Sequence, residues 1–427
     1  MCFRMGALCP PHLDRASAVT YRVAMTQFDP AALLVSRSKT ADEGAIIRMS
    51  QRARELRAKG ADVVSMTLGE PDFDTPDNIQ AAASEAMKKG FTHYSPVMGI
   101  PELRAALAHK LKHENGLDYA AGEIVLANGA KQAIANAMLS IIEAGDEVIM
   151  LAPFWVSYEI TVRFCGGTPV VLHAGVEEGY KVPAHRIAAA ITPRTKLIVL
   201  NSPSNPSGAV WSKAELEELA AVVRRHPQLM VMSDEIYEYI IFDGEMHSFG
   251  ALPGMRERTI TVNGFSKGFA MTGWRLGYAA APEPIARAMA RMQSAISAGA
   301  NQFVQRAAIA ALEGPRDSVQ RMRQEYQLRR DMVQGGLNAI PGVRMGNIPA
   351  TFYAFPDVSA LLGKKAGNHV LDTTDALCDW LLDQHHVATV PGSAFGAPGS
   401  IRLSFACSEA EIGKAMARMQ TGLGSLV

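Results

Sequence analysis

The chain of 427 residues has few cysteines and few aromatic side chains, and its charges balance. The cysteines, at positions 2, 9, 165, 378 and 407, show no CxxC or Cys/His ligand spacing, so neither a disulfide framework nor a metal site is expected. Lys and Arg together number 42, as do Asp and Glu, which gives no electrostatic reason to expect nucleic acid or an anionic membrane as a partner. No apolar run reaches the roughly 18–20 residues of a membrane-spanning helix. We therefore expect a cytoplasmic protein with reduced cysteines.

The first part of the chain shows no periodic apolar pattern. Residues 1–24 include Cys2, Pro10 and Pro11, and they lack the sustained apolar segment of a secretory signal. We expect a disordered extension over residues 1–28. Translation that starts upstream of a natural start at Met25 would account for the same pattern.

Most of the remaining sequence alternates between short apolar runs and amphipathic stretches. The runs 147–151, 196–200 and 259–262 are aliphatic and partly β-branched, and amphipathic segments such as 130–144 lie between such runs. Nearly continuous apolar strands separated by helices predict an α/β fold, with a mostly parallel sheet that helices cover on both faces.

The character of the sequence changes after Pro315, where a long charged helix candidate is followed by short strand and helix signals. This pattern predicts a smaller α+β unit. The length, with 48% apolar and 20% charged residues, leaves room for two domains. We expect a large domain over residues 79–315 and a small domain built from residues 29–78 and 316–427.

A lysine in a tight, glycine-rich connection is the most informative local feature. Ser266 and Lys267 follow the strand-like run 259–262, and Arg275 comes eight residues after the lysine. A lysine held in this way can bond covalently to an aldehyde cofactor, and a nearby arginine can hold a phosphate. A surface lysine and arginine in a glycine-rich loop would give the same pattern.

Other polar candidates follow neighbouring strand-like runs, where ligands of α/β sheets collect. Asp234 and Tyr237 follow the run 229–232, and a carboxylate there can pair with a protonated ring nitrogen. Asn205 lies in a proline-bounded loop after the run 196–200 and can donate to an anionic oxygen. A helix cap, a packed tyrosine and a rigid turn are the ordinary structural alternatives.

Three further features complete the candidate site. Gly129 and Ala130 begin a predicted helix, whose N-terminal N–H groups can bind phosphate. Trp155 follows a strand-like run and can stack on a flat ring, although core packing explains it equally well. Arg402 alternates with apolar residues in the run 400–405, so it points to the other face and can grip a carboxylate by two parallel hydrogen bonds. An exposed strand arginine is the alternative.

Together and in this order, the motifs resemble the class I pyridoxal-phosphate aminotransferases of fold type I, in particular their bacterial aspartate/aromatic branch. The resemblance covers about residues 40–420. It implies a large domain with a mostly parallel seven-stranded sheet that binds pyridoxal 5'-phosphate. It also implies transfer of an amino group from an L-amino acid, aspartate or aromatic, to a 2-oxo acid such as 2-oxoglutarate by a ping-pong mechanism. The matching segments are 68–76, 205–208, 234–237, 266–267, 271–278 and 402–405.

The resemblance implies a role for each residue around the cofactor ring. Lys267 is the covalent attachment point and later carries a proton. Asp234 pairs with the pyridine nitrogen, and Trp155 stacks on the ring. Tyr237 and Asn205 hydrogen-bond the phenolic oxygen, which stabilises its anionic form.

The resemblance likewise implies a phosphate site made by the Arg275 side chain and the amides of Gly129 and Ala130. Many members of the family place a phosphate-binding serine where this chain has Gly264, and Ser266 is the candidate to supply that hydroxyl instead.

For the substrate and the assembly, the resemblance assigns Arg402 to the α-carboxylate, with the Gly69 backbone allowing close approach. Asn205 and Trp155 are expected to contact the substrate as well. Tyr94 matches a tyrosine that reaches the phosphate of the partner subunit. The implied assembly is therefore a homodimer with shared active sites.

Two positions give opposite indications of the amino donor. Lys131 matches a lysine that helps to bind the distal carboxylate of aspartate, which favours dicarboxylic substrates. Ile46 stands where that branch usually has a threonine, and an apolar side chain there suits aromatic or aliphatic donors. A pyridoxal-phosphate β-lyase and a non-catalytic ligand-binding protein on the same scaffold are the alternatives to an aminotransferase.

Overall fold

The computed structural model describes residues 29–35, 38 and 44–427. The extension expected over residues 1–28 therefore lies outside the described residues. The chain divides into two compact units, one ending at Ala41 and the other beginning at Asp42.

The first unit, Met1–Ala41, contains the short 3-10 helix η1 (Pro30–Leu33). The carboxylate of Asp29 caps this helix by accepting a hydrogen bond from the Ala31 N–H at 2.9 Å. The second unit, Asp42–Val427, contains all the sheets and hydrophobic cores of the described residues.

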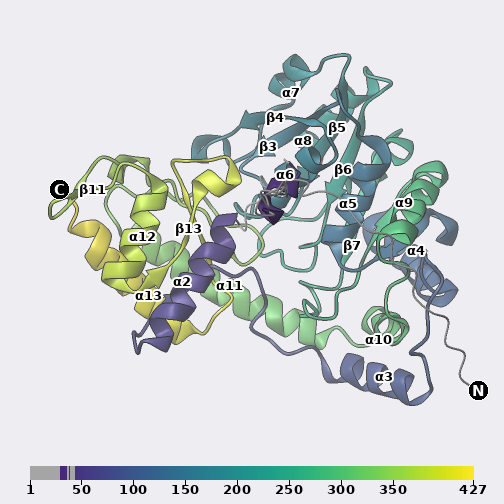
Figure 1. The fold of residues 1–427 in the computed structure, drawn as a ribbon, viewed down its shortest axis with the longest axis horizontal. Helices are drawn as coiled ribbons and strands as arrows, with labels where there is room; N and C mark the ends of the chain where they lie inside the picture. The colour runs from purple at the N-terminus through teal and green to yellow at the C-terminus, as the bar shows by residue number, and fades with distance from the viewer. Residues whose placement is uncertain (1–28, 36–37, 39–43) are drawn as a thin grey trace, which may run out of the picture. The chain divides into compact units, whose positions relative to one another are not determined.

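Seven strands form the main sheet of the second unit, in the spatial order β2-β8-β7-β6-β5-β3-β4 (Figure 1). All neighbouring pairs from β7 to β4 are parallel, and β8 lies antiparallel between β2 and β7. The mostly parallel seven-stranded sheet expected from the sequence is confirmed. Its strands are β2 (Ile124–Ala127), β3 (Glu147–Ala152), β4 (Thr168–His173), β5 (Thr195–Asn201), β6 (Met230–Asp234), β7 (Thr259–Gly264) and β8 (Gly277–Ala280).

Helices cover both faces of this sheet, which is why its strands are nearly continuously apolar. Successive side chains of a strand point to opposite faces. Val148 and Met150 of β3 accordingly pack in one core with α5 and α9, and Ile149 packs in another core with α8. The helices are α2 (Gly44–Ala58), α3 (Asp77–Lys88), α4 (Pro101–Asn115), α5 (Ala130–Ile141), α6 (Ser157–Phe164), α7 (Ala184–Ala190), α8 (Lys213–Arg224), α9 (Glu283–Ile296), α10 (Gln302–Glu313), α11 (Asp317–Asn338), α12 (Thr374–His385) and α13 (Glu409–Gly424).

Local chemistry sets several helix boundaries. Pro101 is the first residue of α4, where its missing N–H costs no hydrogen bond, and Gly116 ends this helix in the left-handed conformation with φ 69°. At the start of α8, the Ser212 hydroxyl accepts a hydrogen bond from the Glu215 N–H at 3.3 Å, and the Glu215 carboxylate accepts one from the Ser212 N–H at 2.8 Å.

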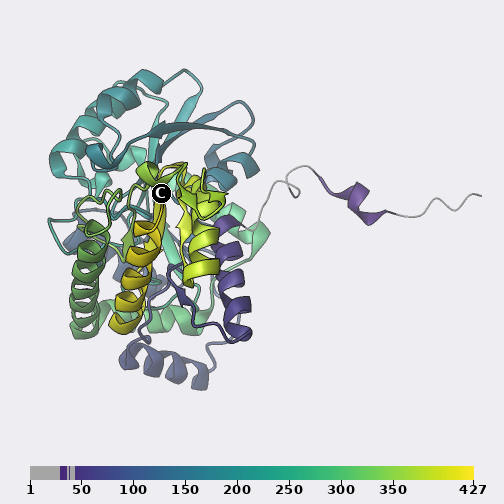
Figure 2. The same cartoon turned by 90° about the vertical axis from the view of Figure 1, so that its left-hand side faces the viewer.

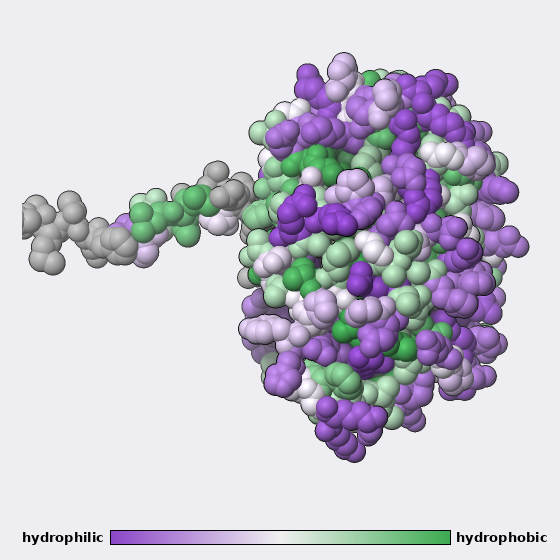
Figure 3. Space-filling model, turned by 90° about the vertical axis from the view of Figure 1, so that its right-hand side faces the viewer, coloured by the Kyte–Doolittle hydropathy of each residue, from purple (hydrophilic) through white to green (hydrophobic). Residues whose placement is uncertain are grey.

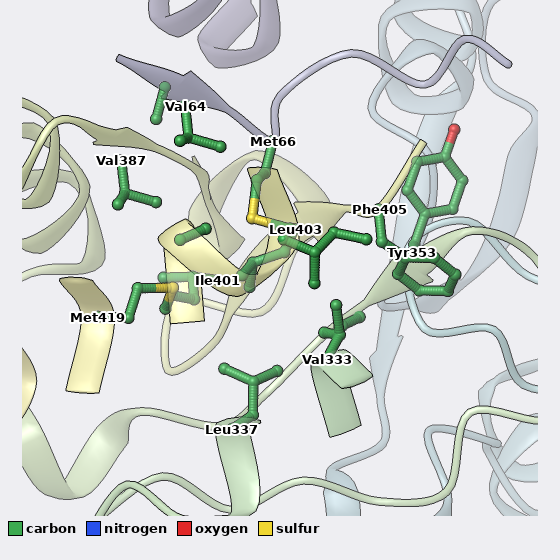
Figure 4. Packing of buried hydrophobic residues seen from close by; sticks show 14 of the residues in the cluster. Val64, Met66, Val333, Leu337, Tyr353, Val387, Ile401, Leu403, Phe405 and Met419 are labelled. Carbon is green, nitrogen blue, oxygen red and sulfur yellow. The ribbon is translucent and has the colours of Figure 1, made fainter. Parts of the chain in front are cut away.

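The residues after α11 build a smaller α+β part with its own core. Its antiparallel sheet has β14 at the centre, between β13 and β9. Because β1 pairs with β12, a segment near residue 64 joins this part, and Val64, Val387 and Leu403 meet in its core (Figure 4). Figure 2 shows α2, α11, α12 and α13 side by side here. The strands are β1 (Val64–Ser65), β9 (Tyr353–Ala354), β10 (Lys365–Ala366), β11 (His369–Val370), β12 (Val387–Ala388), β13 (Val390–Pro391) and β14 (Ile401–Ser404).

Residues 42–427 form one compact unit, with no dividing line between a large and a small domain. The domain limits expected from the sequence therefore stay a prediction. The face of this unit in Figure 3 is mostly hydrophilic, with small scattered apolar patches. Among the described residues, no helix is both long and apolar enough to cross a membrane. In the same part of the chain, no group of three His, Cys, Asp or Glu side chains is placed to hold a metal ion.

Candidate active site

A cavity of about 460 Å³ lies where the main sheet meets the C-terminal part of the second unit. Strand β6 ends in this cavity at Asp234, and β5 ends in it at Asn201. The carboxyl ends of parallel strands are the usual place for ligands in an α/β sheet. The structure brings most of the predicted site residues together here. They are Gly69, Ala130, Lys131, Trp155, Asn205, Asp234, Tyr237, Ser266, Lys267, Arg275 and Arg402.

Lys267 follows β7 and projects its ammonium group into the cavity, where it donates a hydrogen bond to the carbonyl oxygen of Gly69. Burial lowers the pKa of Lys267 to about 8; the charge of Glu70 opposes this shift, and the charge of Arg402 adds to it. A larger fraction of this amine is therefore neutral near pH 7–8 than of an ordinary lysine. A neutral amine can act as a nucleophile or as a base.

Asp234 places a buried carboxylate in the wall of the same cavity. It accepts hydrogen bonds from the Tyr158 hydroxyl at 2.6 Å and from the Ile236 N–H at 3.2 Å. Burial raises the pKa of Asp234 to about 6, although these two hydrogen bonds and the charge of Lys267 lower it. Within the described residues no Lys, Arg or His forms an ion pair with Asp234, so a cationic ligand group would be stabilised here.

Arg402 is a buried cation that also faces the cavity, with only 1% of its surface exposed. Its guanidinium donates to Asn205 Oδ1 at 3.1 Å and to the carbonyl oxygen of Thr67. The rings of Tyr353 and Phe395 lie at 4.7 and 4.9 Å from it. In the part of the chain that the structure describes, Arg402 has no carboxylate partner and its Nε has no acceptor. A ligand carboxylate would complete this arrangement.

The N-terminus of α5 and Arg275 form a second cationic region of the cavity. The first N–H groups of a helix have no intrahelical acceptor and can bind an anion. Gly129, which caps α5 with φ 87°, lies against Arg275, since a Cβ on Gly129 would come within 2.6 Å of Arg275 Nη2. A Cβ on Gly277 would come within 2.3 Å of Ala130 N. Arg275 itself has φ 55°, a conformation that is strained for a residue other than glycine.

Lys131, Trp155 and Ile46 line another part of the cavity wall. The Lys131 Nζ lies 5.0 Å from the centroid of the Trp155 ring. Burial, and then the charge of Arg275, lower the pKa of Lys131. The two residues with opposite implications for the donor, Lys131 and Ile46, therefore both face the cavity.

Two predicted residues do not line this cavity. Gly129 lies against Arg275, which does line the cavity, whereas Tyr94 is 93% exposed at the surface of the chain. Sequence reasoning in turn missed Tyr158 and Tyr353, which both line the cavity. The only local sign of Tyr158 was its position three residues after Trp155.

The residues of the chain from 61 to 419 match the family model for aminotransferase class I and II. The chain belongs to this family. It is an aminotransferase, and the expected fold type I architecture and the recognition of the bacterial aspartate-type branch are confirmed. The matches also support pyridoxal-phosphate-dependent transamination of amino acids.

This aminotransferase is similar to proteins of known name over most of its length. It is 45% identical to an aspartate/prephenate aminotransferase of Cereibacter sphaeroides, over 88% of this chain and 94% of the relative. The solved aspartate aminotransferase of Rhizobium meliloti is 41% identical, with a TM-score of 0.89, over 92% of this chain and 99% of the other. The aspartate aminotransferase of Thermus thermophilus with maleate has a TM-score of 0.86 at 41% identity, over 91% and 99%.

Proposed function

We propose that this aminotransferase binds pyridoxal 5'-phosphate at Lys267 and transfers an amino group from aspartate to a 2-oxo acid such as 2-oxoglutarate. The observation that carries the proposal is the buried Arg402, which has no carboxylate partner among the described residues and shares one cavity with Lys267 and Asp234. A buried cation without a partner is costly, and a substrate α-carboxylate offsets that cost.

The residues of the cavity fit the cofactor. The buried Asp234 carboxylate suits the protonated ring nitrogen, and the Tyr237 hydroxyl and Asn205 suit the phenolic oxygen. Trp155 offers a flat face to the ring. When bound, pyridoxal 5'-phosphate provides an electron sink for the electron pair that remains when the substrate loses its α-proton.

The phosphate of the cofactor fits the second cationic region. The Arg275 guanidinium and the N–H groups at the start of α5, next to Gly129 and Ala130, would hold it. Ser266 lines the same cavity and is 7% exposed, so its hydroxyl is available for this site. We assign to Ser266 the role that a serine at position 264 would otherwise have.

Lys267 moves the proton in this proposal. Its free amine would accept the α-proton, because burial keeps a substantial fraction of this amine neutral at pH 7–8. Arg402 would hold the α-carboxylate in the same cavity as the Lys267 amine.

Lys131 supports a dicarboxylic donor. Its ammonium lies at the cavity wall beside Trp155, and among the described residues it has no carboxylate partner. The names of the relatives, which include aspartate aminotransferases, support the same choice. Ile46 covers part of the wall with apolar surface, so aromatic donors are the second candidates.

A donor panel with 2-oxoglutarate as acceptor tests this choice. We expect kcat/KM to be highest for aspartate, and we expect Lys131→Gln to lower that value by about tenfold or more, as the loss of one hydrogen bond to a charged group would. Alanine should be affected much less, because it has no distal carboxylate. Lys213→Gln, an exposed lysine that begins α8, is the matched control.

Preference for phenylalanine or leucine over aspartate, with no effect of Lys131→Gln, would contradict the dicarboxylic assignment. Release of pyruvate from a donor without any 2-oxo acid present would instead indicate the β-lyase alternative.

We infer a homodimer in which the two subunits share their active sites. Tyr94 is 93% exposed and does not line the cavity of its own chain, so its side chain is free to reach the active site of a partner subunit. Sedimentation should give about twice the 45.9 kDa of the chain. A cytoplasmic location stays a prediction.

Subunit mixing tests the sharing of sites. A hybrid of a Tyr94→Ala subunit with a Lys267→Ala subunit contains one complete site, so mixing the two variants should restore activity. Mixing Lys267→Ala with Asp234→Asn is the control. Each of these substitutions damages the site of the subunit that carries it, so both sites of the hybrid are defective and no activity should be restored. Equal results from the two mixtures would contradict shared sites.

A further inference from the structure

Tyr353 links two groups of the cavity that lie far apart in the sequence. Its hydroxyl is 2.9 Å from the hydroxyl of Tyr237, and its ring centroid is 4.7 Å from the Arg402 guanidinium. Tyr353 lines the cavity, and only 1% of its surface is exposed. It therefore contacts both the tyrosine assigned to the cofactor and the arginine assigned to the substrate carboxylate.

The register of the smaller sheet explains why the Tyr353 ring covers Arg402. Tyr353 of β9 pairs with Ser404 of β14, and Arg402 lies two residues before Ser404 on the same face. Such diagonal neighbours in an antiparallel pair are within reach of long and aromatic side chains. Phe395 covers the guanidinium at 4.9 Å as well, so that Arg402 has two aromatic neighbours.

Gly69 leaves the space that the Tyr353 hydroxyl occupies. A Cβ on Gly69 would lie 2.0 Å from the Tyr353 Oη, so only glycine at position 69 leaves room for this hydroxyl. The carbonyl oxygen of the same glycine accepts the hydrogen bond from Lys267. The Tyr353 hydroxyl is thus confined between Gly69 and Tyr237, and it has little freedom to turn away.

We propose that Tyr353 is a positioning residue of the transamination site: its hydroxyl orients the Tyr237 hydroxyl toward the cofactor, and its ring holds the Arg402 guanidinium in place. The inference rests on the proposed function, because it assigns Tyr237 to the cofactor and Arg402 to the carboxylate. The hydroxyl acts on Tyr237 and the ring acts on Arg402, so one substitution can remove the hydroxyl alone and another can remove both.

Tyr353→Phe removes the hydroxyl and keeps the ring. With pyridoxal 5'-phosphate bound, we expect the pH midpoint of the visible absorbance to rise by about half a unit, the size of one weakened hydrogen bond. The direction follows because Tyr237 would no longer be held toward the phenolic oxygen, whose anion it stabilises. The dissociation constant of maleate, a dicarboxylate without an amino group, should change by less than about threefold, since the ring still covers Arg402.

Tyr353→Leu removes the ring as well. We expect maleate to bind roughly five- to thirtyfold more weakly in this variant, because the guanidinium loses one aromatic neighbour. Tyr119→Phe is the matched control: this tyrosine is also buried, its hydroxyl faces the carbonyl oxygens of Arg256 and Thr259, and it does not line the cavity.

A double-mutant cycle shows whether Tyr353 acts through Tyr237. If it does, Tyr353→Phe shifts the pH midpoint in the wild-type background and leaves it unchanged in a Tyr237→Phe background. An unchanged midpoint in the single variant, or an equal shift in both backgrounds, overturns the inference. A wild-type protein that shows no visible absorbance with pyridoxal 5'-phosphate would instead overturn the proposed function.

Discussion

Replacing Lys267 with alanine is expected to reduce kcat for amino transfer by at least about 10⁴-fold, since it removes both the covalent attachment point and the proton carrier. The absorbance near ~420–430 nm that a covalently attached cofactor gives should disappear as well. Among the described residues, no other lysine donates a hydrogen bond to the Gly69 carbonyl oxygen in the cavity. Steady-state assays and a visible spectrum of the purified variant measure both effects.

Lys181→Ala is the control for this prediction. Lys181 is partly buried and pairs with Glu215 at 2.6 Å, outside the cavity. The control should keep its turnover and its colour. Wild-type turnover in the Lys267→Ala variant would refute the assignment of this lysine, whatever its spectrum.

Replacing Asp234 with asparagine is expected to lower kcat/KM by about 10²–10³-fold, the usual effect of removing one preorganised electrostatic group from a site. The amide keeps the shape of the side chain and removes the negative charge that would face the ring nitrogen. Because burial raises the pKa of Asp234 to about 6, the wild-type protein should also bind pyridoxal 5'-phosphate more weakly as the pH falls below about 6. This loss should be absent in Asp234→Asn, which has no charge to lose.

Tyr158→Phe tests the pKa of Asp234 by removing a hydrogen bond to its carboxylate. The Tyr158 hydroxyl stabilises the ionised carboxylate at 2.6 Å, so its removal should raise the pKa of Asp234 and move the loss of cofactor affinity to a higher pH. Titration of the dissociation constant between pH 5 and 8 measures this shift. An unchanged profile in both variants would show that Asp234 does not face the cofactor.

The sequence predicts the fold, and most of the site residues that it predicts meet in one cavity, for a physical reason. Asp234 ends β6 and Asn205 follows β5, and parallel strands of one sheet end at the same edge. Lys267 follows β7, the next strand of the sheet, so a local motif places it there as well. Apolar strands and amphipathic helices are likewise local signals.

The missed residues depend on contacts between distant segments. Tyr158 meets Asp234 across 76 positions, and Tyr353 meets Tyr237 across 116 positions. Apart from the position of Tyr158 three residues after Trp155, no local pattern distinguishes either tyrosine from a core aromatic residue, and only the folded chain shows which polar group each one faces. In our proposal the role of Tyr94 needs a second chain, and the choice of donor needs the balance between Lys131 and Ile46, which both line the cavity. Neither can be derived from a local pattern in one chain.

The most direct test is to reduce the protein with borohydride in the presence of pyridoxal 5'-phosphate, digest it and map the modified peptide. The account predicts a single pyridoxyl group on the Nζ of Lys267. A pyridoxyl group on another lysine such as Lys131, or on no residue, would contradict it.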